Sequence, residues 1–155
     1  MMGDKMVARG IRNNNPTNIR KGENWEGLAE VQDDPAFCVF KDPKWGIRAF
    51  CRLMLNYKKL YGIDTVRGII DRFAPASENN TTSYIEHVCL RLGVHRDKSL
   101  DLTDMNCMLE LCKAIIQHEC GIIPYSDNPF FIVVFIDSQT SFKKSFISSF
   151  STIQT

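Results

Sequence analysis

Hydrophobic residues recur at helical spacing in the part of the chain that follows residue 42. The first such segment begins with the N-cap and first-turn pair Asp42-Pro43, and Gly62 ends it. Later segments end before Pro75, at Gly93 and at Gly121. The pattern predicts helices over residues 43–61 and about 64–73, from the polar loop 77–82 to residue 92, and from about residue 103 to 120.

The N-terminal third has little periodicity. Residues 9–36 are rich in Asn, Gly, Pro and Asp, which favour turns and loops. The short alternating piece Phe37–Phe40 follows and predicts a strand. The expected fold class is therefore mainly α, a helical domain with a small β-hairpin or loop region near the N-terminus.

The last predicted helix ends on a glutamate. Glu119 follows Ile115 and Ile116 by one turn, and Gly121 stops the helix. A helix C-terminus carries partial negative charge, which disfavours a carboxylate there. This charge and burial against isoleucines would both raise the pKa of a carboxyl group, as a general acid at neutral pH requires. The alternative is an exposed glutamate balanced by His118 or a lysine.

The chain has 155 residues, of which 44% are hydrophobic and 24% charged, so one domain is expected. We place this domain at residues 9–127. Residues 128–155 differ in character, being rich in Ser and Phe, and predict either an atypical, frameshifted tail or a terminal strand with a disordered end. The net charge of +1 gives no global attraction to nucleic acid, and a basic cluster lies at Arg9, Arg12, Arg20 and Lys21.

The six cysteines show no C-x-x-C spacing, and several lie in apolar helical stripes. We therefore expect reduced, buried thiols. His118-Glu119 is not followed by the second histidine of an H-E-x-x-H motif, so no metal site and no cofactor are predicted. A peptidase nucleophile at Cys120 remains a minor alternative.

The N-terminal residues lack the apolar core of a signal peptide, and the run Phe130–Ile136 is too short to span a bilayer. The expectation is synthesis in a bacterial cytoplasm without a signal peptide and without a membrane span.

Four fragments together carry a family resemblance: RGIRNNNPTNIRKGENWEGL, FCVFKDPKWGIRAFCRLMLNY, TVRGIIDRFAPASENNTTSYIEHV and AIIQHECGIIPYSD. In this order and spacing they resemble the lysozyme-like structural proteins of bacteriophages and prophages, over about residues 9–127. The resemblance implies an α+β lysozyme-like fold and a virion-associated protein that degrades murein, described variously as a muramidase, lytic transglycosylase or endopeptidase.

A second resemblance concerns the glutamate. AIIQHECG is similar to the A-x-x-x-E-S-G pattern that ends the catalytic helix of lytic transglycosylases, with Cys120 in the place of serine. In those enzymes an Asn-rich segment, a W-x-G piece and an aromatic strand follow this helix. Here the corresponding pieces precede it, which suggests a circularly permuted arrangement, and this requires the two ends of the domain to lie close together.

The resemblance implies Glu119 as the catalytic acid. Candidate substrate-binding residues are Asn14, Asn15, Asn18, Trp25, Tyr84 and Tyr125. For the asparagines the alternative is turn formation, and for Trp25 and Tyr84 it is packing in the core. Tyr84 is also a candidate for orienting Glu119. A partner carboxylate is not obvious and is not required by substrate-assisted or single-acid routes; the available ones are Glu23, Glu26, Asp33, Asp34 and Glu78.

The sequence therefore predicts cleavage of the peptidoglycan glycan strand by a phage- or prophage-derived protein that acts at the cell wall or periplasm. Peptidoglycan is the expected partner, together with other phage virion proteins. Two alternatives stay open. One is a peptidoglycan endopeptidase on the same fold, and the other is a non-catalytic virion or wall-binding protein.

Overall fold

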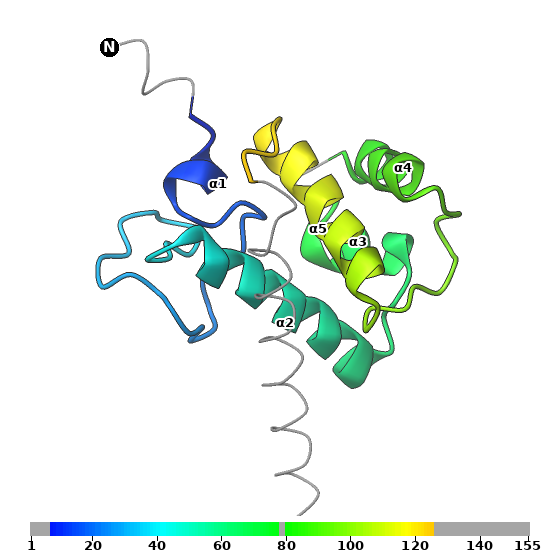
Figure 1. Cartoon of the computed structure of the whole chain (residues 1–155), viewed down its shortest axis with the longest axis horizontal. Helices are drawn as coiled ribbons and strands as arrows, with labels where there is room; N and C mark the ends of the chain where they lie inside the picture. Colours follow the sequence, from blue (N-terminus) through cyan, green and yellow to red (C-terminus); the bar gives the residue numbers. More distant parts are fainter. Residues whose placement is uncertain (1–6, 78–79, 126–155) are drawn as a thin grey trace, which may run out of the picture.

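The computed structural model describes residues 7–77 and 80–125. Within these ranges the elements are the helices α1 (Arg9–Arg12), α2 (Pro43–Tyr61), α3 (Val66–Phe73), α4 (Thr81–Leu92) and α5 (Met105–Cys120). Helix α2 lies between the N-terminal loops on one side and the group α3–α5 on the other (Figure 1). The mainly α class is confirmed. The predicted tail 128–155 lies outside the described residues.

Helix α2 forms where the sequence indicates. The Asp42 side chain accepts a hydrogen bond from the Lys44 N–H over 3.0 Å, and Pro43 occupies the first turn. Gly62, with φ 66°, ends the helix in the left-handed conformation. One face of α2 is buried, and this face includes the fully buried Phe50 and Met54.

The other three predicted helices are also confirmed, each with a side-chain cap. Thr65 accepts from the Gly68 N–H, Asn80 from the Ser83 N–H, and Asp104 from the Cys107 N–H. Helix α5 packs against α4, α2 and α1, and α3 packs against α4. The core is formed chiefly by the apolar faces of α2 to α5.

The N-terminal region differs from the prediction in two ways. The short helix α1 was expected to be loop, and the strand predicted at Phe37–Phe40 is absent from the described residues. Isolated antiparallel bridges, Arg20 with Phe37 and Leu28 with Phe40, take its place. The Gln32 side chain explains the difference, because its amide donates to the Val39 carbonyl and its oxygen accepts from the Val39 N–H. The Gln32 side chain thus occupies the N–H and carbonyl of Val39, which a longer β-ladder would need for strand pairing.

The close approach of the N-terminal loop to α2 depends on a glycine. A Cβ atom at Gly46 would lie 2.3 Å from the Asn14 carbonyl oxygen. The absence of a side chain at Gly46 therefore lets the Asn-rich loop pack on the first turn of α2.

All six cysteines are free. None of the helices in the described ranges is long and apolar enough to cross a membrane.

Candidate active site

Glu119 lies in the last turn of α5, half-buried, with each carboxylate oxygen hydrogen-bonded to a different part of the chain. The Tyr84 hydroxyl, from α4, donates to Oε1 over 3.0 Å. The Asn18 amide, from the loop after α1, donates to Oε2 over 2.9 Å. Three segments far apart in sequence therefore fix the orientation of one carboxylate.

Tyr84 is fully buried, and its ring stacks on His118 with a centroid separation of 3.6 Å. Burial, together with the neighbouring charge of Glu119, raises the pKa of Tyr84. The phenol consequently remains protonated and acts as a hydrogen-bond donor. The prediction that Tyr84 binds substrate is not supported, since a fully buried side chain cannot reach a ligand; the alternative roles of orienting Glu119 and packing between helices both agree with the structure.

Asn18 adopts the left-handed backbone conformation, with φ 55°, which asparagine tolerates better than most residues. Its main-chain N–H donates to the Asn15 carbonyl, closing a turn that directs the side chain toward α5. The Asn18 Oδ1 atom is buried and has no hydrogen-bond partner among the described residues. Asn18 thus combines the two roles that the sequence left open, turn formation and a place at the site.

Asn14 and Asn15 both hold the loop through side-chain hydrogen bonds to the main chain. The Asn15 side chain is fully buried, donates to the carbonyls of Ile19 and Cys38, and accepts from the Ile19 N–H. Asn14 donates to the Phe40 carbonyl over 3.0 Å. Both side-chain amides therefore bind main-chain carbonyls that strand pairing would otherwise use. This agrees with turn formation, the alternative role that the sequence allowed for these asparagines.

Cys120 follows Glu119, and its thiol donates to the Pro16 carbonyl over 3.2 Å. Burial and the charge of Glu119 raise the pKa of Cys120 to about 11. A reactive cysteine needs the opposite shift. The geometry thus gives Cys120 a structural role and disfavours the thiol-peptidase alternative. Tyr125, another predicted substrate residue, packs partly buried against the core, and burial raises its pKa to about 12.

A groove runs beside this site between α2, α3 and the loop 18–26. It consists of a cavity of about 820 Å³ and an adjoining one of about 180 Å³, which share Glu23, Trp25, Leu53, Tyr57 and Arg72. Asn18 lines the smaller cavity, and Glu119 lines neither. Asn18 is therefore the side chain that connects the groove with the carboxylate. We call the two cavities together the arginine groove.

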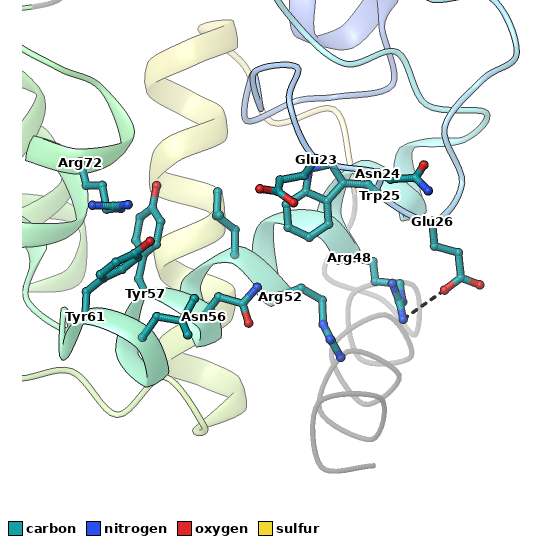
Figure 2. Close-up of a pocket in the computed structure, with 12 residues that line it drawn as sticks. Glu23, Asn24, Trp25, Glu26, Arg48, Arg52, Asn56, Tyr57, Tyr61 and Arg72 are labelled. Carbon is teal, nitrogen blue, oxygen red and sulfur yellow. Dashed lines mark ion pairs between the residues drawn. The ribbon is translucent and has the colours of Figure 1, made fainter. Parts of the chain in front are cut away.

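The arginine groove combines aromatic and charged side chains (Figure 2). Arg72, Tyr57 and Tyr61 gather at one end, and Arg48 pairs with Glu26 at 3.3 Å at the other. Trp25 lies between these ends, partly buried, with an indole N–H that has no hydrogen-bond partner in the described ranges. This place agrees with both roles that the sequence allowed for Trp25, stacking on a sugar and anchoring the loop.

The sequence did not single out the arginines or tyrosines of this groove. Tyr57 and Tyr61 are four residues apart, within the helix predicted over residues 43–61. No local signal marks Arg72, because its partners lie on another helix. The one clue in the sequence was the i,i+4 spacing of the two tyrosines. In the structure Tyr61 is 53% exposed.

The candidate partner carboxylates have different environments. Asp34 is buried and accepts two hydrogen bonds from Arg9, both of 2.6 Å, which hold its pKa well below the usual range. Asp34 thus stabilises the loop and is an ordinary polar loop residue, which was the alternative to a role as partner carboxylate. Glu23 lines both cavities of the arginine groove, Asp33 lines a separate pocket, and Glu78 lies outside the described residues.

His118 and His87 approach each other with their Nδ1 atoms 3.1 Å apart. Burial lowers the pKa of His118, and His87 shifts it in the same direction, although Glu119 opposes them. In the part of the chain that the structure describes, no three His, Cys, Asp or Glu side chains are placed to hold a metal ion.

Comparison with known proteins gives one clear relationship. The chain is similar to Protein P5 of Pseudoalteromonas phage PM2, with 41% identity over 124 residues, which is 77% of this chain and 76% of that protein. The chain matches no protein-family model.

Proposed function

The chain belongs to the family of Protein P5 of Pseudoalteromonas phage PM2, and from this phage relationship and the site geometry we propose that it cleaves the glycan strand of bacterial peptidoglycan. Glu119 is the proposed general acid. The observation that carries the proposal is the carboxylate of Glu119 at the end of a buried helix, fixed by Tyr84 and Asn18.

The proposed reaction needs one carboxyl group in two states. Protonated Glu119 gives its proton to the glycosidic oxygen as the bond between that oxygen and the anomeric carbon breaks. The resulting carboxylate then takes a proton from the group that attacks the anomeric carbon, either a water molecule or a hydroxyl of the same sugar. Water would give a reducing sugar, and an internal hydroxyl would give an anhydro sugar.

Tyr84 and Asn18 suit this cycle, because both are neutral donors. Their hydrogen bonds stabilise the carboxylate that exists after the first proton transfer. They also restrict the rotamers of Glu119, so that less conformational freedom is lost when the substrate binds.

The arginine groove provides room for a long polar chain next to this site. Aromatic faces such as that of Trp25 suit the apolar faces of sugar rings, and Asn18 connects the groove with Glu119. We propose that the glycan strand lies in this groove with the cleaved bond near Asn18.

The closeness of the first and last described elements supports the permuted relationship to lytic transglycosylases. A Cβ atom on Gly10 of α1 would lie 3.0 Å from the Cys120 Sγ at the end of α5 (Figure 1 shows the two helices together). The Asn-rich segment therefore meets the glutamate helix in space, although it comes first in the sequence. We infer a lysozyme-like arrangement and action at the cell wall or periplasm, from a virion or during lysis, beside other virion proteins.

A second candidate function is wall binding without cleavage, in a structural virion protein. One observation favours it, namely that Glu119 lines neither cavity of the arginine groove. In that case the groove would bind peptidoglycan and Glu119 would only hold Asn18 in place. Peptide-bond cleavage is the third possibility, and the protonated Cys120 speaks against a thiol mechanism.

Mass spectrometry of products from purified peptidoglycan tests the proposal. The unaltered chain should release fragments cut between sugars, and Glu119→Gln should not. Glu86→Gln, an exposed change on α4, is the matched control. Fragments cut between amino acids, or no fragments from a folded protein, would contradict glycan cleavage.

A further inference from the structure

We propose that the arginine groove selects glycan strands that carry stem peptides, and that Arg72 binds a carboxylate of the peptide. The inference rests on the proposed substrate, peptidoglycan, and adds which part of it is recognised. Stem peptides supply carboxylates along an otherwise uncharged glycan. A groove that contains exposed arginine can therefore distinguish a peptide-bearing strand from a bare one.

The first argument is the geometry of Arg72. Its guanidinium carbon lies 3.8 Å from the centroid of the Tyr61 ring and 5.5 Å from that of Tyr57. Tyr61 thus covers a face of the guanidinium group, while N–H donors remain at its edge. Side-on N–H pairs match the two oxygens of a carboxylate.

The second argument is the distribution of charge. Three arginines and two glutamates line the larger cavity. Glu26 pairs with Arg48 at the end away from Arg72 (Figure 2). Within the described residues no carboxylate forms an ion pair with Arg72. Arg72 is therefore a positive charge of the groove that can pair with an anionic ligand at the end formed with the tyrosines.

The third argument is the shape of the groove. The smaller cavity is lined by Asn18, Trp25 and Arg72, and the larger one continues from Trp25 and Arg72. A ligand next to Asn18 can therefore contact Trp25 and Arg72 in the smaller cavity and continue into the larger one. A sugar chain with a charged branch can make these contacts: the sugars would contact Trp25, and the branch would reach Arg72.

Binding measurements test the inference separately from cleavage. The probes are soluble glycan strands with intact stem peptides and uncharged N-acetylglucosamine strands of the same length, which carry neither peptides nor carboxylates. Fluorescence anisotropy gives the Kd of the full chain carrying Glu119→Gln, which keeps the strands uncut. We expect the peptide-bearing strand to bind about tenfold more tightly, as one charge-assisted hydrogen-bonded contact would provide.

The matched variants are Arg72→Gln and Arg67→Gln in the same background. Both residues lie on α3, but Arg67 pairs with Asp97 at 2.7 Å and does not line the groove. Arg72→Gln should bind the two strands equally, whereas Arg67→Gln should keep the preference. Arg72→Lys, which keeps the charge and loses the planar donor pair, should keep only part of it.

Equal binding of both strands by the parent protein would overturn the inference, and so would a preference that persists in Arg72→Gln. The chain without Glu119→Gln is assayed for cleavage in parallel. If it cuts no glycan bond but shows Arg72-dependent binding, the proposed reaction is wrong and this inference stands.

Discussion

The Asn18 side-chain amide donates to Glu119 Oε2 over 2.9 Å, although 101 positions separate the two residues. This contact joins the Asn-rich loop to the end of α5. It also joins the arginine groove to the proposed acid, because Asn18 lines one of its cavities. The position of Glu119 relative to the groove therefore depends on this long-range contact.

Tyr84→Phe removes the hydroxyl that donates to Glu119 Oε1 and keeps the ring that stacks on His118. We expect kcat for glycan cleavage to fall about tenfold and KM to change little, because a lost hydrogen bond to a charged group affects the reacting state. Steady-state kinetics with soluble glycan strands measures both constants. An unchanged kcat would contradict this role of Tyr84.

Gly10→Ala tests the packing of α1 against the end of α5. The new methyl group would lie 2.8 Å from the Asn15 carbonyl oxygen and 3.0 Å from both Asn18 Oδ1 and Cys120 Sγ. We expect a loss of about 1–3 kcal/mol in unfolding free energy from overpacking, measured by urea denaturation. Cleavage should fall as well, since Asn18 has to move. An alanine variant of unchanged stability and activity would contradict this packing.

Asp34 predicts a pH dependence of stability. Its pKa is lowered in the folded state, chiefly by the hydrogen bonds from Arg9. The stabilisation it provides is therefore complete above the unfolded pKa, about 4, and is lost as the pH falls below that value. The Tm of the parent chain should fall on acidification from pH 7 to 3, and that of Asp34→Asn, already lower at pH 7, should fall less. The exposed neighbour variant Asp33→Asn should follow the parent chain, and parallel curves for Asp34→Asn and the parent would refute the assignment.

Cys120→Ser introduces the residue found in the transglycosylase pattern that AIIQHECG resembles. A serine hydroxyl can donate to the Pro16 carbonyl as the thiol does. We expect the variant to fold and to retain most of its cleavage activity. In the parent chain, iodoacetamide should modify Cys120 slowly at neutral pH, because its pKa is raised to about 11. Loss of all activity in Cys120→Ser would instead favour a thiol nucleophile.

The helices could be predicted from the sequence because their signals are local. Asp42, Thr65 and Asp104 cap helices within three residues of their own positions, and Gly62 and Gly93 end them. Helix periodicity and caps need no knowledge of the rest of the fold.

The prediction of a strand at Phe37–Phe40 was wrong because side chains distant in sequence determine the hydrogen bonds of this segment. Asn15 and Gln32 take main-chain partners in this segment, and only two bridges remain. The sequence does not distinguish an asparagine whose side chain binds main-chain groups of a loop from one that lies at a ligand site. Asn15 and Asn18 illustrate this, since one is fully buried and the other reaches Glu119.

The candidate site was only partly predictable for the same reason. Glu119 was marked by its unfavourable place at a helix C-terminus, which is a local feature. Arg72 became visible only when α3 packed beside the tyrosines of α2. Residues that work through tertiary contacts leave no such mark in the sequence.

The role of Glu119 as the acid is tested directly by the rate at which the chain releases glycan fragments from purified peptidoglycan, with and without the Glu119 carboxyl group. Glu119→Gln should lower this rate by at least about 100-fold, while Glu86→Gln should keep the parent rate, and both variants should stay folded. A Glu119→Gln protein that cleaves as fast as the parent chain would contradict the assignment of Glu119 as the acid.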